Sequence, residues 1–292
     1  MSNNSKTLRL LFPQWQGGIN PNYYFAPKLL EWLAPADPNS ETAEVPVAAN
    51  FETPLKLEYD FYAGNILVEQ AKAAAQLLEI KRPDRIITFG GECSVSQAPF
   101  DYLHGRYPEH MGILWVDAHP DISQPQFFQD EHAMVLGSLL GEGAPEMAAL
   151  VKHPYTPDQV LYAGLIADEM LDYEQDYMKK TPMPWILPER LTENSDPVLQ
   201  WLKEKDIRHL CIHFDVDALT PEDFRSELCN EPHLGPVDYA VGKLTLKQVT
   251  RLLQDVSAHT DVVGLTISEY MPWDAIALHN AMRKIPIFGG NV

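Results

Sequence analysis

The chain has 292 residues, a formal net charge of −19 at pH 7 and a sequence pI near 4.8. Hydrophobic residues make up 45% of it and charged residues 22%, a composition that excludes an intrinsically disordered chain. Because a surface this acidic repels phosphate backbones and anionic lipid headgroups, we expect small cationic ligands or metal ions as partners, and neither nucleic acid nor a membrane.

The cysteine content indicates a reducing compartment. Cys93, Cys211 and Cys229 include no close-spaced pair and cannot form a disulfide framework. No window approaches the roughly 18 consecutive apolar residues that a membrane-spanning helix needs. The first residues also lack the charged and apolar regions of a secretory signal. We therefore expect a cytoplasmic protein.

Short apolar runs alternate with helix-like stretches along the whole chain. The runs predict strands at Leu8–Phe12, Arg85–Phe89, Gly112–Val116, Gln159–Leu165, His209–Val216 and Val262–Ser268. Helices are expected at Ala63–Ile80, Met134–Leu140, Ala167–Met178, Val198–Glu204 and Leu246–Val256. This alternation predicts an α/β fold with a parallel sheet covered on both faces. We expect one domain over residues 1–292, with Pro35–Leu55 as an irregular excursion.

Polar side chains cluster where four of these strands stop. They occur in Gly90–Ser94, Asp117–Asp121, Asp215–Asp217 and at Glu269. In open parallel sheets, ligands bind in the crevice beyond the carboxyl ends of the strands. The four segments are therefore expected to meet at one edge.

Asp117, His119 and Asp121 have the spacing of residues that point to one side of an extended segment, and Asp215 and Asp217 repeat it. One such pair alone is equally well explained by helix capping or turn chemistry. Two converging clusters favour a metal site, because several close carboxylates cannot all stay ionised without a cation. The donors suit a hard or borderline ion such as Mn²⁺, and carboxylates can bridge two ions whose shared water becomes hydroxide. The implied reaction is a hydrolysis.

The order of GGECS (Gly90–Ser94), DAHPD (Asp117–Asp121), a downstream His132, FDVDAL (Phe214–Leu219) and ISEY (Ile267–Tyr270) resembles the ureohydrolases, the family of arginase, agmatinase and formiminoglutamase. The resemblance covers roughly residues 85 to 285. It implies a three-layer α/β/α fold with a mostly parallel sheet of about eight strands. It also implies a two-manganese centre that hydrolyses a guanidino or formimino C–N bond through a metal-bridging hydroxide, in a homo-oligomer.

Carried over by motif, the resemblance assigns a role to each of these residues. Asp117 and Asp215 would bridge the ions, Asp121 would complete one shell, and His119 with Asp217 would complete the other. Glu269 would face the substrate guanidinium, and His132 would carry a proton to the leaving amine. Asp121, His132 and Glu269 are thus the expected catalytic residues.

Cys93 departs from the family motif GGDHS, whose histidine ligates one of the metals. A thiolate is a softer ligand than an imidazole. Three outcomes are open: two metals with one thiolate ligand, a single metal, or a centre that no longer catalyses. The corresponding alternative function is a degenerate ureohydrolase that acts as a non-catalytic binding protein.

The segment between Asp121 and His132, ISQPQFFQDE, lacks the residues that hold the amino-acid end of arginine in arginases. Phe127 and Phe128 either line an apolar tunnel or pack the loop down. Asp130 or Glu131 could meet a second cation. Arginine is therefore not the default substrate.

Overall fold

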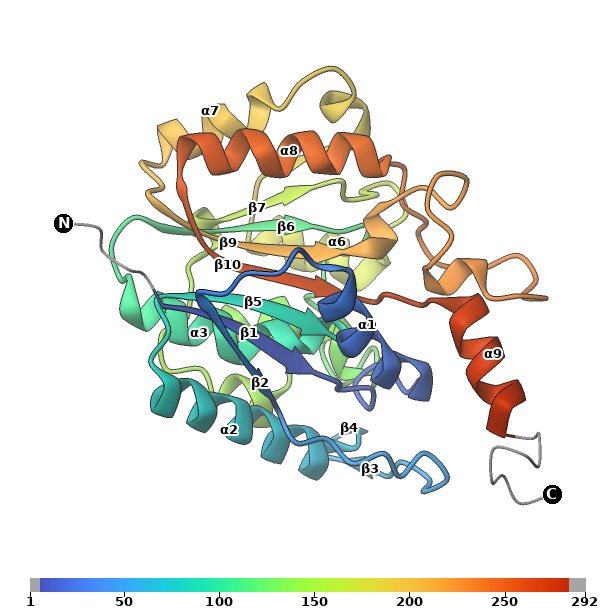
Figure 1. Cartoon of the computed structure of the whole chain (residues 1–292). Coiled ribbons are helices and arrows are strands. Elements are labelled where there is room, and N and C mark those ends of the chain that lie inside the picture. Colours follow the sequence, from blue (N-terminus) through green and yellow to red (C-terminus); the bar gives the residue numbers. More distant parts are fainter. Residues whose placement is uncertain (1–5, 284–292) are drawn as a thin grey trace.

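The computed structural model describes residues 6–283, and its centre is an eight-stranded sheet in which every neighbouring pair of strands is parallel (Figure 1). The strand order is β2-β1-β5-β10-β9-β6-β7-β8. The bounds are β1 Thr7–Phe12, β2 Ser40–Glu44, β5 Arg85–Gly90, β6 Met111–Val116, β7 Val160–Ala163, β8 Trp185–Ile186, β9 His209–Asp215 and β10 Asp261–Ser268. A separate antiparallel hairpin joins β3 (Leu57–Glu58) and β4 (Phe61–Tyr62).

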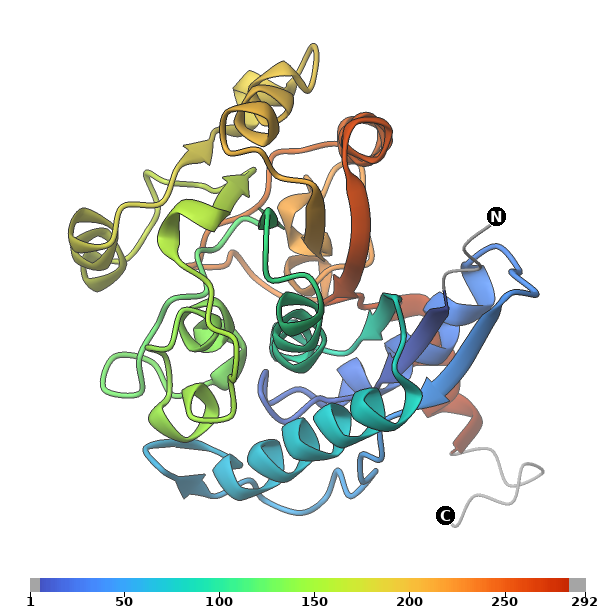
Figure 2. The same cartoon turned by 90° about the vertical axis from the view of Figure 1, so that its left-hand side faces the viewer.

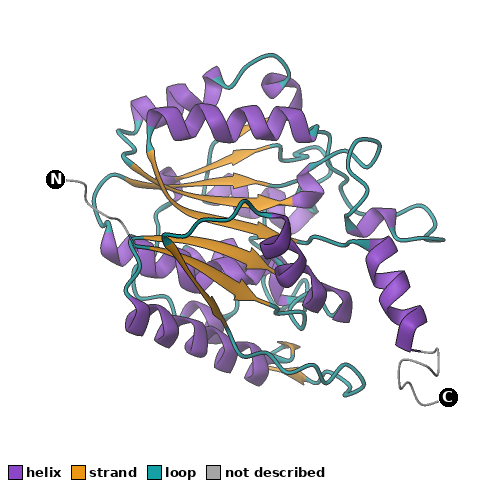
Figure 3. Cartoon of the chain, viewed as in Figure 1, coloured by secondary structure: helices purple, strands orange, loops and turns teal. Residues whose placement is uncertain are grey.

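Helices cover both faces of this sheet, which gives the three expected layers (Figure 2, Figure 3). On one face lie α1 (Ala26–Leu33), α7 (Asp196–Glu204) and α8 (Leu246–His259). On the other lie α2 (Gly64–Lys81), α3 (Gln97–Arg106) and α6 (Asp172–Lys180). The shorter helices α4 (Val135–Leu139) and α5 (Pro145–Ala148) follow β6, and α9 (Trp273–Arg283) follows β10.

The central strands are buried on both sides because their sequences are almost continuously apolar. Every residue of β6 is buried, with Leu114 and Val116 packed in the cluster that includes α7 and α8. Ile113 and Trp115 point to the opposite face, toward α3. This alternation fixes which side chains of a strand reach each layer, since a shift of one residue would reverse them.

The sequence prediction is confirmed for the parallel sheet and for the α/β/α layers, and it is wrong in two places. Pro35–Leu55 is not wholly irregular, because it contains the edge strand β2, which pairs with β1. The helix expected from Ala167 begins only at Asp172. The outermost parts of the expected single domain, residues 1–5 and 284–292, lie outside the described residues. Over residues 6–283, each helix is too short or too polar to cross a membrane.

Candidate metal centre

The candidate site lies at the carboxyl edge of four adjacent strands, β5, β10, β9 and β6. Cys93 follows β5, Glu269 follows β10, and Asp215 ends β9. Asp117 and Asp121 follow β6. The strands run parallel and next to one another, so segments far apart in the sequence deliver their side chains to one place.

One set of donors consists of Asp117, His119 and Asp217, whose ligand atoms all lie within 4.8 Å of one another. His119 Nδ1 is 3.0 Å from Asp217 Oδ2 and 3.6 Å from Asp117 Oδ1. The backbone N–H of His119 also donates to Asp117 Oδ1 at 2.7 Å. This bond fixes the turn after β6 and holds the imidazole beside both carboxylates.

A second set consists of Cys93, Asp117, Asp121 and His213, all buried and again within 4.8 Å of one another. Asp117 thus belongs to both sets. A third set joins Cys93, Asp215 and Glu269, in which the Cys93 thiol donates to Asp215 Oδ2 at 2.7 Å. The expected metal residues therefore lie together, although their roles as ligands remain a prediction.

Two buried oxygens at this edge lack a protein hydrogen-bond partner, namely Asp121 Oδ2 and Asp217 Oδ1. A buried carboxylate oxygen without a partner bears the full cost of losing water. Divalent cations held by these donor sets would satisfy both atoms. Carboxylate and imidazole donors of this kind fit Mn²⁺ or a similar ion.

The electrostatics of the site also favour a bound cation. Burial and the nearby charges of Asp217 and Asp117 raise the pKa of Asp215 well above its usual range. Burial and Asp117 likewise raise the pKa of Asp121. Although burial opposes its ionisation, the nearby imidazoles of His119 and His213 hold the pKa of Asp117 below the usual value. Without a cation, these carboxylates compete for protons rather than all carrying charge.

Glu269 and His132 form a pair at the rim of the donor sets. Glu269 Oε1 lies 3.3 Å from His132 Nδ1 and accepts the backbone N–H of Cys93 at 3.2 Å. Although burial lowers the pKa of an imidazole, the bond to Glu269 raises that of His132 to about 9. The imidazole is therefore protonated at neutral pH in the metal-free protein.

These residues open into a cavity of about 450 Å³. Nine carboxylates line it: Asp121, Asp130, Glu169, Glu174, Asp215, Asp217, Glu227, Asp238 and Glu269. Among the described residues that line it, none is a lysine or an arginine. Phe128 and Asp130 contribute to the wall, whereas Phe127 stacks on Tyr173 with ring centroids 4.6 Å apart. Glu131 is completely buried and is not part of the lining.

The sequence interpretation missed His213. This residue lies inside β9, within an otherwise mostly apolar run, yet its side chain belongs to the second donor set. Stepping two residues back from Asp215 along the alternating faces of β9 would have found it.

Comparison with known proteins identifies relatives along most of the chain. A model of the arginase family matches residues 33–278. The arginase of Entamoeba histolytica is 24% identical over 144 residues, which are 47% of this chain and 48% of that protein. The arginase of Glaciozyma antarctica is 25% identical over 197 residues, which are 64% of this chain and 54% of that protein. The chain thus matches about half the length of these two relatives.

Solved structures agree in fold over nearly the whole length. The Entamoeba histolytica arginase in complex with L-ornithine superposes with a TM-score of 0.78 at 19% identity and covers 92% of each chain. The Bacillus caldovelox arginase superposes with a TM-score of 0.74 at 17% identity, over 92% of this chain and 91% of that one. The family match over residues 33–278, together with this fold, shows that the chain belongs to the arginase family.

Proposed function

We propose that the protein is a metal-dependent hydrolase that cleaves a guanidino or formimino C–N bond in a small cationic substrate. The observation that carries the proposal is Glu269, a buried carboxylate at the rim of the donor sets and open to the acidic cavity. A carboxylate placed there can hold a planar guanidinium by a charge-assisted hydrogen bond.

Asp117, His119 and Asp217 would hold one divalent ion, and Asp117, Asp121 and Asp215 the other, with Mn²⁺ the expected metal in both positions. Such ions supply Lewis acidity that makes a water molecule nucleophilic near neutral pH. Glu269 orients the substrate carbon toward that edge. His132 holds a proton, and because Nδ1 is bonded to Glu269, its Nε2 is left to protonate the leaving amine.

The lining of the cavity favours a substrate that carries a second positive group and no carboxylate. Nine carboxylates line it, and its described lining offers no lysine or arginine to bind an anionic end. A carboxylate on the substrate would be desolvated among like charges. An amine at the far end would instead find counter-charges such as Asp130 and Glu174.

Four substrates that differ by one group at a time test this proposal: agmatine carries an amine, arginine an amine and a carboxylate, 4-guanidinobutyrate a carboxylate, and butylguanidine neither. With Mn²⁺-loaded protein and urea release as the measurement, we expect kcat/KM to be highest for agmatine and lowest for 4-guanidinobutyrate. Equal values for agmatine and arginine would contradict the role of the acidic wall. Formiminoglutamate, with formamide as product, tests the formimino alternative.

The variant Glu269→Gln tests the counter-charge. It should leave metal content unchanged and lower kcat/KM by about 10²–10³-fold, the cost of removing one preorganised electrostatic partner of the reacting group. Near-normal turnover would show that Glu269 is structural.

The second candidate function, a non-catalytic binding protein, is favoured by Cys93 in the place of a histidine ligand. It predicts that the metal-loaded protein binds a guanidino compound without releasing urea. The expected cytoplasmic location is supported by three free cysteines. A homo-oligomer is a separate expectation, to be checked by light scattering.

A further inference from the structure

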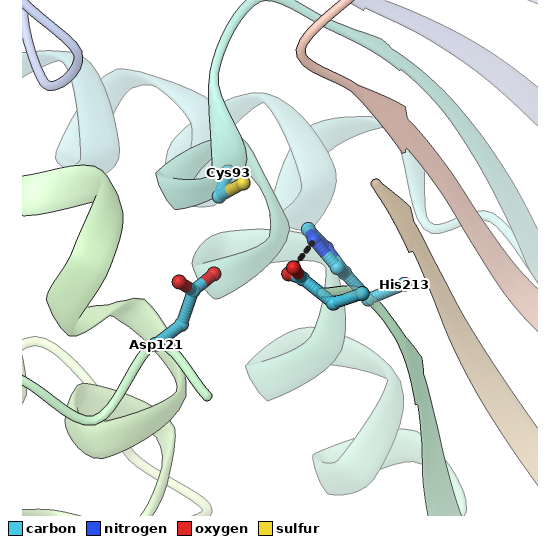
Figure 4. Close-up of side chains that lie close together, drawn as sticks. Cys93, Asp121 and His213 are labelled. Carbon is cyan, nitrogen blue, oxygen red and sulfur yellow. Dashed lines mark ion pairs between the residues drawn. The ribbon is translucent and has the colours of Figure 1, made fainter. Parts of the chain in front are cut away.

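The turn after β5 lacks the imidazole that the family motif provides, and Cys93 occupies that position. Its thiol donates to Asp215 Oδ2 at 2.7 Å and lies 3.5 Å from Glu269 Oε1. It thus has two carboxylate neighbours on the side of β9 and β10. The donor set that Cys93 shares with Asp117 and Asp121 nevertheless contains one imidazole, which comes from His213 (Figure 4).

His213 is completely buried and its ring faces this set. It precedes Asp215 by two residues on β9, so both side chains project from the same face of the sheet. Its Nε2 lies 3.6 Å from Asp117 Oδ2. The dashed line in Figure 4 marks an ion pair of His213. In that view the labelled side chains of Cys93, Asp121 and His213 point toward a common space.

The surroundings of His213 hold its ring in the orientation that a metal ligand needs. Its Nδ1 is 2.8 Å from the hydroxyl oxygen of Ser96, which is also completely buried. Its ring stacks on Trp115, with centroids 3.7 Å apart and planes 7° from parallel. Histidines that bind metals through one nitrogen commonly donate the other N–H to a fixed acceptor, which sets the tautomer. When Nδ1 donates to Ser96, the lone pair of Nε2 is available for a metal ion; the nearest protein hydroxyl to it, that of Ser268, lies 3.4 Å away.

An independent observation points to a ligand site in front of this nitrogen. Asp121, only 5% exposed, directs Oδ2 into the set without a hydrogen-bond partner. Asp121 also has a left-handed backbone, with φ of 49°, which is uncommon for a residue other than glycine. Two backbone amides, those of Leu136 and Gly137, hold its carbonyl at 3.0 and 3.1 Å. The chain thus fixes the backbone of Asp121, and no protein group satisfies its Oδ2.

We propose that His213 Nε2, with Asp117 and Asp121, ligates a divalent ion, so that an imidazole from inside β9 replaces the one missing at position 93. This inference rests on the proposed metal-dependent function. It gives the ion a nitrogen and carboxylate oxygens without requiring a thiolate. Cys93 then acts as the hydrogen-bond partner of Asp215.

The competing explanation is that His213 only positions Asp117. The two explanations differ in how a variant of His213 changes the affinity for each ion. Asp117 belongs to both donor sets, so disturbing it weakens both ions, whereas His213 itself belongs to one set. A ligand role for His213 therefore predicts that its variant loses affinity for one ion and keeps its affinity for the other.

The variant His213→Asn keeps a group that can bond to Ser96 and removes the nitrogen at the Nε2 position. A matched control is His104→Asn, because His104 is also buried, stacks on Tyr155 at 4.1 Å and bonds through Nδ1 to a backbone carbonyl. His104 belongs to none of the donor sets found in the described residues. Circular dichroism checks the fold of each variant.

Titration with Mn²⁺ and Co²⁺ by calorimetry, with stoichiometry from elemental analysis, is the main measurement. We expect wild type and His104→Asn to bind two ions. In His213→Asn one ion should bind more than about 100-fold more weakly, beyond the 10–100-fold typical of losing an orienting partner, while the other changes little. If wild type binds no divalent ion, the proposed function fails. If wild type binds two ions and His213→Asn either keeps both or weakens both by the same factor, the inference is overturned and the function stands.

A measurement on wild-type protein covers the case in which His213→Asn does not fold. Co²⁺-loaded protein with ¹⁵N-labelled histidine should show two imidazoles with strongly hyperfine-shifted exchangeable protons, one from His119 and one from His213. The His213 proton should be protected from solvent, because it lies on Nδ1 against buried Ser96. A single shifted imidazole would contradict ligation by His213.

Discussion

Two of the three donor sets share Asp117, and this partition predicts how much stability Asp117 and Asp217 confer through bound metal. A ligand present at 100 times its Kd stabilises the native state by about 2.7 kcal/mol. With an unfolding entropy of about 2.1 cal/mol/K per residue, a chain of this length has about 0.6 kcal/mol/K, so each ion should raise the Tm by about 4–5 °C. Two saturated ions should raise it by about 9 °C.

The perturbations are Asp117→Asn and Asp217→Asn. Asp117 lies in both sets, so its variant should lose nearly the whole metal-dependent rise in Tm. Asp217 lies only with Asp117 and His119, so its variant should keep about half of the rise. Using the difference between Mn²⁺-loaded and chelator-treated samples of the same variant removes any change in basal stability.

Differential scanning calorimetry with and without Mn²⁺ measures this difference. Asp176→Asn is the control, because Asp176 is an exposed carboxylate on α6 that pairs with Lys179. It should keep the full rise. If Asp217→Asn keeps all of the rise or loses all of it, or if Asp117→Asn keeps half or more, the assignment of donors to two sets is refuted.

The remaining predictions concern His132 and Gly91. In metal-free protein the His132 imidazole should titrate near pH 9 by NMR, and in Glu269→Gln well below that, because burial is then opposed only by the charges of Glu92 and Asp130; a midpoint still near 9 would contradict the pairing. Since its folded pKa is raised, the stabilisation from this pair is present below pH 6.5 and lost as the pH rises through 9. Gly91→Ala should cost about 3 kcal/mol or more in urea unfolding, because its Cβ would meet the Gln14 carbonyl oxygen at 1.7 Å. Gly235→Ala, with open space around it, should be near neutral, and equal costs would refute the reasoning.

The sequence predicted the centre of the sheet better than its edges. Buried strands such as β6 and β9 must be apolar on both faces, so their composition shows them. The edge strand β2 has the sequence SETAE and no buried residue, so no apolar pattern marks it. Helix α3, QAPFDYLHGR, contains Pro99 and Gly105, which lower its helical signal, and tertiary packing holds it in place.

In the site, the carboxylates that follow β6 and the one that ends β9 lie at the same edge of the sheet, and their roles as ligands stay a prediction. The sequence did not show that Asp121 and Glu269 both take left-handed backbone conformations, with φ of 49° and 61°. Neither residue type requires that conformation, so only the folded surroundings impose it. For Glu269, the backbone N–H is held by the Gly91 carbonyl at 2.8 Å, a contact between segments 178 positions apart in the sequence.

Position 93 shows why a motif cannot be judged residue by residue in this fold. Only β10 separates β5 from β9 in the sheet, and all three strands end at the same edge. A donor missing from the turn after β5 can therefore be supplied from within β9, where a side chain two residues before Asp215 already faces the site. The replacement requires partners that fix the new ring, and Ser96 and Trp115 provide them. When the donors are counted by their position in space and not motif by motif, the site has two imidazoles, those of His119 and His213, although position 93 is a cysteine.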